Sequence, residues 1–252
     1  MMTRFRKGGY AVPLFLAFML LLCALAWCLR GGKDRGWVTT VHTSAEQENG
    51  LPLCVVIDAG HGGEDGGASS EAGLMEKEVN LAVAMALRDL CEAAGIPTVM
   101  TRTEDILLYD RNVDFAGRKK VLDLAARRMV AEDVAEKYDG NSLFISIHMN
   151  AFPVPRYDGM QVWYSVGDPR SAEVAAAIQT ASAALMPDNH RKIKAAGSRI
   201  YLLDRIKSPA VLVECGFMSN PTEAERLSRE DYRHALAAVI FAGMVAGQGD
   251  GS

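Results

Sequence analysis

The stretch Leu53-Cys-Val-Val-Ile-Asp58-Ala-Gly-His61-Gly-Gly63 is the most informative part of the sequence about the fold. Residues 53–57 form a continuous apolar run rich in β-branched side chains, which is typical of a strand buried on both faces of a sheet. A glycine-rich loop that carries His61 follows directly. Open α/β sheets present their ligand sites at the carboxyl ends of such strands, so the stretch predicts both a fold class and the place of a site.

Apolar periodicity predicts that strands and helices alternate along the rest of the chain. From Glu76 onward, apolar residues recur at spacings of three and four, which predicts a helix that Gly95 ends. We expect a helix over 114–138 with an inner face formed by Leu122, Ala125, Ala126 and Met129. Further helices are expected over 171–185, capped by Ser171, and over 231–245.

Short apolar runs predict five more strands, at 96–101, 143–147, 160–164, 200–203 and 210–213. Alternation of strands and helices is typical of a sheet whose strands are mostly parallel. The sequence therefore predicts a single α/β domain, over 51–247, with a central, mostly parallel sheet of about six strands covered by helices on both faces.

The N-terminal residues predict that the chain is addressed to a membrane. Basic residues precede an apolar run over 10–29, which at about 20 residues is long enough to span a bilayer. Ala24-Leu-Ala26 offers a cleavage site, so residues 1–30 are expected to be either a signal peptide or an uncleaved membrane anchor. Residues 31–50 are polar and predict a linker. We therefore expect an exported protein at the outer face of the cytoplasmic membrane or in the cell wall.

Charge and cysteine spacing argue against nucleic-acid binding and against a function based on cysteine chemistry. The net charge is -4 with acidic and basic residues spread along the chain, so there is no basic field for nucleic acid. The five cysteines are scattered without metal-type spacing, which favours buried thiols over a disulfide framework or a cysteine-zinc site.

Three polar side chains are predicted to converge at one edge of the sheet. His61 follows the first strand, His148 follows strand 143–147, and Glu76 stands in the first turn of the helix that returns from the same edge. Two histidines and a glutamate with an open fourth position form the coordination set of a catalytic zinc ion. Glu78 competes for the third position, but its side chain points about 200° away around the helix, and Glu76 is nearer the turn.

Other residues are expected to support this zinc site. Glu214 follows the apolar strand 210–213 and is the candidate general base. Asp58 is expected to orient His61 or to hold its turn, and Asn150 to fix the loop after His148. The remaining histidines, His42, His190 and His234, are interpreted as solvated or structural. The glycines after His61 are expected to allow close approach of the backbone rather than to bind phosphate.

Four motifs together resemble one known family, the zinc-dependent N-acetylmuramoyl-L-alanine amidases of the third amidase type. They are Val55-Val-Ile-Asp-Ala-Gly-His61-Gly-Gly63, Glu76-Lys-Glu-Val-Asn-Leu81, Phe144-Ile-Ser-Ile-His148-Met-Asn150 and Val211-Leu-Val-Glu214-Cys-Gly-Phe217-Met-Ser-Asn220. The resemblance covers about residues 53–245 and implies that His61, Glu76 and His148 bind zinc and that Glu214 is catalytic. The chain departs from the family's pattern in a longer, more charged segment between Arg111 and Asn141, and in Met149 where alanine is common.

Within the family, three stretches look like the CwlD-type germination-specific amidases of spore-forming bacteria: Thr101-Arg-Thr-Glu-Asp105, Ser198-Arg-Ile-Tyr-Leu-Leu203 and Val213-Glu-Cys-Gly-Phe217. This implies hydrolysis of the amide between N-acetylmuramic acid and L-alanine in peptidoglycan, as a step toward the muramic lactam of the spore cortex. The alternatives are a vegetative wall amidase of division or autolysis, a non-catalytic peptidoglycan-binding regulator with the same fold, and a zinc hydrolase of another bond. Because the sequence shows no wall-binding repeat, targeting is expected to come from the anchor, the groove or an activating protein partner.

Overall fold

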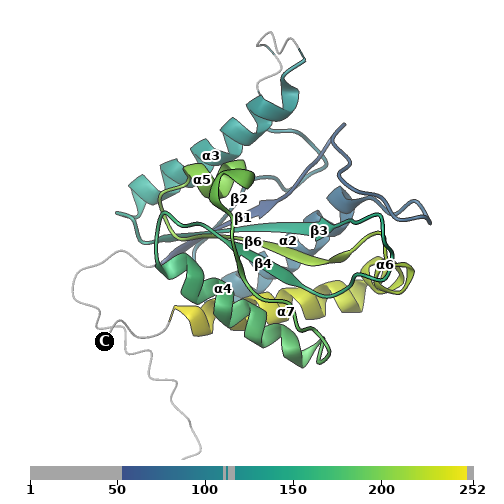
Figure 1. The fold of residues 1–252 in the computed structure, drawn as a ribbon. Helices are drawn as coiled ribbons and strands as arrows, with labels where there is room; N and C mark the ends of the chain where they lie inside the picture. The colour runs from purple at the N-terminus through teal and green to yellow at the C-terminus, as the bar shows by residue number, and fades with distance from the viewer. Residues whose placement is uncertain (1–52, 110–111, 113–116, 249–252) are drawn as a thin grey trace, which may run out of the picture. The chain divides into compact units, whose positions relative to one another are not determined.

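A six-stranded sheet between two layers of helices forms the described part of the molecule (Figure 1). The structure is a computed structural model that describes residues 53–109, 112 and 117–248. The predicted membrane segment, 1–30, and the predicted linker, 31–50, lie outside these residues. Among the helices of the described part, none combines the length and the apolar character needed to cross a membrane.

The sheet consists of β1 (Cys54–Ala59), β2 (Thr98–Met100), β3 (Ser142–Asn150), β4 (Gln161–Tyr164), β5 (Lys194–Ala195) and β6 (Ala210–Phe217). Their order across the sheet is β2-β1-β3-β6-β4-β5. The first four strands in that order pair in parallel, whereas β4 runs antiparallel to β6 and parallel to β5. The predicted mostly parallel sheet is thus confirmed, and β1, β3 and β6 end at the same edge.

Helices cover both faces of the sheet, as predicted. One face carries α2 (Glu76–Ala93), α4 (Arg170–Ala181) and α7 (Glu230–Gly247), and the other carries α3 (Lys119–Lys137) and α5 (Tyr201–Arg205) (Figure 1). Side chains of β1 alternate between the two layers, because successive residues of a strand point to opposite faces. Val55 and Ile57 pack with α2, α4 and α7, while Cys54 and Val56 pack with α3 and α5.

Helix α2 follows its predicted pattern closely. Val79, Val83 and Leu87 are fully buried against the sheet, which explains the spacing of apolar residues. The helix ends at Ala93, and Gly95 has φ +74°, a left-handed conformation that glycine adopts without strain. The position of α2 matters for the site because its first residue is Glu76.

The predicted strand at 200–203 is wrong, because these residues enter the short helix α5. Leu202 and Leu203 are buried in the core beside α3, while Tyr201 is exposed. An apolar run of this length suits either a strand or one helical turn, and packing decides between them. The sixth strand is instead β5, two exposed residues, Lys194 and Ala195, that show no apolar pattern.

The predicted inner face of α3 is also wrong. Its buried residues are Asp123, Arg127, Ala131 and Val134, whereas Met129 is 57% exposed. The reason is a buried ion pair: Arg127 reaches across to Asp58 in β1. Apolar periodicity places charged residues on the outside of a helix, so it assigns the opposite face when a charge is buried with a partner.

Two smaller predictions have different outcomes. Ser171 does not cap α4, which begins at Arg170; its hydroxyl instead accepts a hydrogen bond from the backbone nitrogen of Ala210 at 3.0 Å. The cysteines of the described part, Cys54, Cys91 and Cys215, are free and buried, as predicted.

Candidate metal centre

The carboxyl ends of β1, β3 and β6 bring the predicted site residues to one edge of the sheet. His61 follows β1, and His148 lies near the end of β3, opposite Glu214 of the neighbouring strand β6. Strand β6 continues past Glu214 to Phe217, so this glutamate stands within the strand rather than after it. Parallel pairing of the three strands therefore fixes the relative positions of all three side chains.

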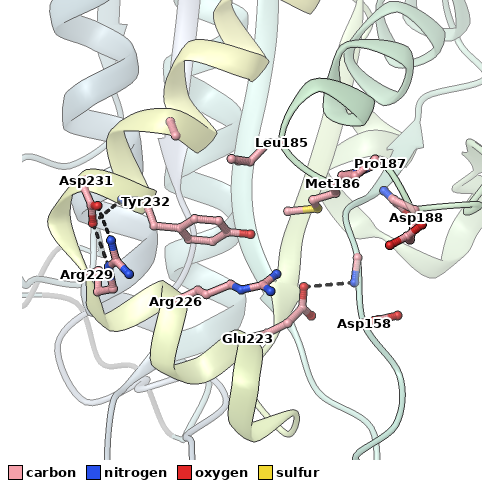
Figure 2. Close-up of a pocket in the computed structure, with 13 residues that line it drawn as sticks. Asp158, Leu185, Met186, Pro187, Asp188, Glu223, Arg226, Arg229, Asp231 and Tyr232 are labelled. Atoms are coloured by element: carbon pink, nitrogen blue, oxygen red, sulfur yellow. Dashed lines mark hydrogen bonds and ion pairs between the residues drawn. The ribbon is translucent and has the colours of Figure 1, made fainter.

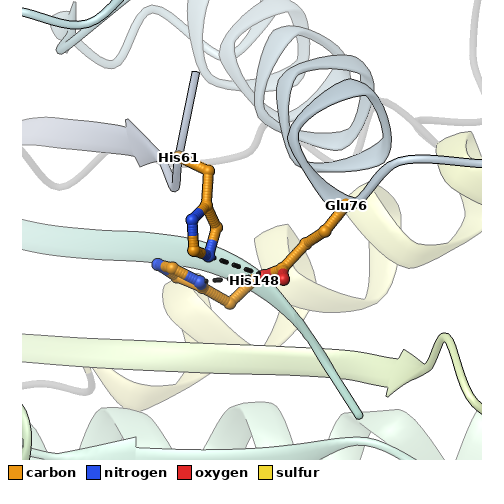
Figure 3. Close-up of side chains that lie close together, drawn as sticks. All are labelled: His61, Glu76 and His148. Carbon is orange, nitrogen blue, oxygen red and sulfur yellow. Dashed lines mark hydrogen bonds and ion pairs between the residues drawn. The ribbon is translucent and has the colours of Figure 1, made fainter. Parts of the chain in front are cut away.

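His61, Glu76 and His148 form one tight cluster (Figure 3). Glu76 Oε1 lies 3.0 Å from His148 Nδ1 and 3.3 Å from His61 Nε2. One donor atom from each residue falls within 4.8 Å of the other two. The two imidazole rings meet edge to face, with centroids 4.9 Å apart. The structure thus brings together the three residues that the sequence singled out.

The cluster suits a metal ion by its chemistry. Two imidazole nitrogens and one carboxylate oxygen form the three-ligand set of catalytic zinc sites, which keep a fourth position open. Beside the set, Glu214 Oε2 is buried and has no hydrogen-bond partner in the described part of the chain. A buried polar atom without a partner is costly, so this one is suited to a group that enters the site during the reaction.

Glu76 is held in place by backbone groups as well as by the histidines. Its Oε1 accepts a hydrogen bond from the backbone nitrogen of Met149 at 3.0 Å, and its Oε2 accepts one from that of Ala68 at 2.8 Å. Burial raises the pKa of this carboxyl, but hydrogen bonds with His148 and His61 outweigh burial and hold the pKa far below its usual range. Glu76 is therefore a carboxylate, the form that binds a metal.

A carboxylate that the sequence analysis missed, Asp65, orients His61. Its Oδ2 lies 3.0 Å from His61 Nδ1, an ion-pair distance without the geometry of a hydrogen bond, and Nε2 faces Glu76. Metal-binding histidines commonly donate their other ring nitrogen to such a carboxylate. Burial lowers the pKa of His61, but Glu76 and Asp65 together raise it above its usual value. The spacing His61-Gly-Gly-Glu-Asp65 within one loop was the available signal.

Close backbone approach explains two of the glycines around the cluster. A Cβ on Gly60 would lie 2.2 Å from His148 Nε2, and one on Gly67 would lie 2.5 Å from Glu76 Oε2. Contacts this short do not occur, so any larger residue would displace a side chain of the cluster. His61 itself has φ +62°, the left-handed conformation that few side-chain-bearing residues adopt.

Glu214 has the electrostatic character of a general base. Burial raises its pKa to about 7, with Glu76 adding to the rise and the two histidines opposing it. A carboxyl whose pKa lies near neutral pH can both accept and return a proton. The site thus contains two buried glutamates with opposite pKa shifts, one suited to bind a cation and the other to move a proton.

Asp58 acts on the turn of His61 through an arginine. It is fully buried, accepts hydrogen bonds from Thr101 and Ser146, and lies 2.6 Å from Arg127 Nη1. Arg127 donates in turn to the backbone oxygens of Ala59 at 2.7 Å and His61 at 2.6 Å. No hydrogen bond joins Asp58 to the His61 ring among the described residues. Of the two roles expected for Asp58, the contacts favour holding the turn.

A second arginine, Arg102, binds the same turn from the other side. Its Nε donates to the oxygen of Ala59 at 2.8 Å, and its Nη2 to that of Gly60 at 3.0 Å. Neither Arg102 nor Arg127 was found by sequence reasoning, because the backbone oxygens that they hold, and Asp58 in the case of Arg127, lie far from them in the chain.

The other candidates lie outside the cluster. The backbone oxygen of Asn150 accepts a hydrogen bond from Met218 at 2.8 Å, which joins the ends of β3 and β6. Glu78, His190 and His234 are exposed, and His42 lies outside the described residues. Of the two glutamates weighed for the third ligand position, only Glu76 faces the histidines.

Several cavities lie close to this edge of the sheet, and two of them differ in their relation to the cluster. One of about 130 Å³ borders His61, His148 and Arg127. A larger cavity of about 560 Å³ lies among the loop around Asp158, α6 (Pro221–Ser228) and the start of α7 (Figure 2). The larger cavity contains none of the three clustered residues, so its size does not make it the reaction site.

Comparisons with known proteins agree with this geometry. The family model described as N-acetylmuramoyl-L-alanine amidase matches residues 55–246. A germination-specific N-acetylmuramoyl-L-alanine amidase from Bacillus subtilis is 35% identical over 199 residues, which cover 77% of this chain and 81% of the relative.

Solved structures show the same fold. The CwlD amidase from Clostridioides difficile, solved in complex with the GerS lipoprotein, has a TM-score of 0.71 and 33% identity over 78% of this chain and 98% of its own. The catalytic domain of the amidase CwlV from Bacillus (Paenibacillus) polymyxa var. colistinus has a TM-score of 0.63 and 28% identity, covering 77% of this chain and 96% of its own.

Proposed function

The chain belongs to the N-acetylmuramoyl-L-alanine amidase family, and from this premise we propose that His61, Glu76 and His148 bind a catalytic zinc ion while Glu214 transfers the proton. As a member, it hydrolyses the amide bond between N-acetylmuramic acid and L-alanine in peptidoglycan. The observation that carries the assignment is the arrangement of the site: a metal-type cluster of three donors beside a buried, unpartnered carboxyl.

The residues around the cluster have different roles in the hydrolysis. When bound, zinc supplies Lewis acidity at the scissile carbonyl. Glu214 removes a proton from the attacking water and delivers it to the nitrogen of the departing peptide, which its near-neutral pKa allows in both directions. Asp65 holds His61, and backbone nitrogens hold Glu76, so the donors keep their positions through the cycle.

The proposed substrate is the peptidoglycan of the spore cortex. The germination-specific relative and the CwlD structure support it, since both exceed 30% identity over more than three quarters of this chain. The activity then serves the formation of muramic lactam. Faster cleavage of vegetative-wall than of cortex peptidoglycan would instead favour the alternative role in division or autolysis.

A protein partner and an extracytoplasmic site of action complete the proposal. Peptidoglycan lies outside the cytoplasmic membrane, so the catalytic part must act there. The solved CwlD amidase is bound to a lipoprotein, which supports a partner of that kind for this chain.

Metal analysis tests the proposed roles separately. We expect about one zinc ion per chain in the wild type, its loss in His61→Ala and His148→Ala, and its retention in Glu214→Gln. Glu214→Gln should still lower kcat by about 10²–10⁴-fold, since it removes proton transfer. Loss of zinc from Glu214→Gln, or full zinc binding by both histidine variants, would contradict the assignment.

A further inference from the structure

A cationic, aromatic cavity of about 230 Å³ adjoins the metal centre at the same edge of the sheet. Its lining residues come from the ends of β3 and β6, the loop after β3 and the segment around β5: Asn150, Phe152, Tyr157, Arg191, Lys194 and Phe217. Phe152 and Tyr157 meet edge to face and both stay partly exposed. This cavity, called here the Arg191 cavity, has two cations and no carboxylate in its lining.

The Arg191 guanidinium is held in a fixed position but keeps free donors. It stacks on the Phe217 ring, 4.5 Å from the centroid, and its Nε donates to the backbone oxygen of Asp158 at 2.5 Å. Among the ion pairs of the described part of the chain, none involves Arg191 or Lys194. The two terminal nitrogens of Arg191 make no hydrogen bond there either. A planar fork of free donors matches a carboxylate.

A buried glutamate, Glu223, connects the two segments that hold Arg191. Its Oε2 accepts a hydrogen bond from the backbone nitrogen of Phe217 at 2.8 Å. Its Oε1 accepts one from the backbone nitrogen of Gly159 at 3.1 Å, the dashed line at Glu223 in Figure 2. The Phe217 ring stacks on the Arg191 guanidinium. The backbone oxygen of Asp158, the residue before Gly159, accepts the hydrogen bond from Arg191 Nε. The position of the Arg191 guanidinium is therefore fixed by the Phe217 ring and the Asp158 backbone, which Glu223 holds in turn.

The register of the strands places this cavity close to the candidate metal centre. His148 pairs with Glu214, and further along the same two strands Asn150 pairs with Phe217. Two to three strand residues correspond to about 7–10 Å. An extended peptide also advances about 3.4 Å per residue, so the second or third residue of a peptide cut at the metal centre reaches the Arg191 cavity.

We infer that the Arg191 cavity binds a carboxylate of the departing stem peptide, so that the enzyme selects acidic peptides. The leaving group is a peptide, and a peptide carries at least its terminal carboxylate beyond the bond that is cut. Arg191 supplies the paired donors, Lys194 adds positive charge, and Phe152 and Tyr157 offer apolar surface for the chain between. This inference rests on the proposed amidase function and adds the part of the substrate that is recognised.

The test compares two substrates and a matched pair of variants. Peptidoglycan fragments are prepared with their peptide carboxylates free or converted to carboxamides, and peptide release is measured by the zinc-loaded enzyme. Arg191→Gln removes the proposed contact. Lys207→Gln removes an exposed cation just before β6, at the opposite end of that strand from Glu214 and Phe217. Arg191→Lys keeps the positive charge but loses the two paired donors of the guanidinium.

The expected result is a specificity effect. Wild type and Lys207→Gln should prefer the free carboxylates by about tenfold or more in kcat/KM, the size of one charge-assisted hydrogen bond. Arg191→Gln should lose that preference, mainly through a higher KM, and Arg191→Lys should fall between.

Three outcomes would overturn the inference. Two of them leave the amidase function intact. In the first, the wild type cleaves both substrates equally. In the second, an Arg191→Gln variant that circular dichroism shows to be folded loses the same factor in kcat/KM on both substrates. The third, a zinc-loaded wild type that releases no peptide from either substrate, would contradict the proposed function itself.

Discussion

At the residue scale, the buried pair of Asp58 and Arg127 links the core to the metal centre. Both side chains are almost fully buried, and Arg127 also binds Asp123 at 2.7 Å. Arg127 donates a hydrogen bond to the backbone oxygen of His61, so the pair holds the turn that carries the His61 imidazole. Removing one partner leaves a buried charge partly uncompensated, which costs far more than removing a surface pair.

The stability contributed by Asp58 should depend on pH. Burial alone would raise its pKa, but the charge of Arg127 and the hydroxyls of Ser146 and Thr101 hold the pKa below its usual value. Its contribution is therefore present above the unfolded pKa of about 3.9 and is lost as pH falls through the lower folded value. Asp58→Asn should reduce the free energy of unfolding at pH 7 by about 3–5 kcal/mol.

Urea unfolding at several pH values checks this prediction. The difference between wild type and Asp58→Asn should shrink as pH falls below about 4, because the carboxyl of the unfolded wild type is protonated there and that of the folded protein only at lower pH. Glu132→Gln, which removes the exposed partner of Arg128, serves as control and should change stability by at most about 0.5 kcal/mol. A difference that stays constant with pH would refute the linkage.

At the element scale, helix α6 supports the edge of the sheet that carries the candidate metal centre. Asn220 caps the helix, accepting hydrogen bonds from the backbone nitrogens of Thr222 at 3.0 Å and Glu223 at 3.1 Å. The cap fixes the first turn of α6, and that turn places Glu223 against Phe217. A side-chain cap is worth about 1 kcal/mol.

Asn220→Ala should therefore lower the free energy of unfolding by about 1 kcal/mol, while Asn220→Asp, which keeps the capping oxygen, should stay close to wild type. Chemical unfolding of the three proteins side by side measures both differences. Equal losses in the alanine and aspartate variants would show that the cap is not the source of the stability.

Prediction from sequence succeeded for elements whose signal is local. The run 53–57 became β1 and the periodicity from Val79 to Leu87 became α2, because burial of each apolar residue agrees with the local pattern. The Ile200–Leu203 run failed because its length fits a strand and a helical turn equally well. The inner face of α3 failed because Arg127 is buried by a partner in β1, which no pattern within the helix reveals.

The same distinction explains how much of the metal centre could be predicted. His61 and His148 belong to strand ends that the fold brings together, and Glu76 begins a helix at that edge, so their convergence follows from topology. Asp65, Arg102 and Arg127 could not be placed in this way. Their roles depend on contacts with single ring or backbone atoms, which only three-dimensional packing specifies.

At the scale of the whole molecule, one edge of a parallel sheet gathers the functional groups. The ends of β1, β3 and β6, with the start of α2, carry the metal-type cluster and the carboxyl suited to proton transfer, and the ends of β3 and β6 also form part of the Arg191 cavity. Helices on both faces exclude water from the sheet, so the exposed edge is where substrate can reach the buried donors.

The most direct test of the central claim is mass spectrometry of peptidoglycan digested by the zinc-loaded enzyme, beside Glu214→Gln. We expect glycan strands with unsubstituted muramic acid and free stem peptides that begin with L-alanine, both absent from the variant digest. Release of acetate, cleavage within the stem peptide, or identical products from wild type and Glu214→Gln would contradict it.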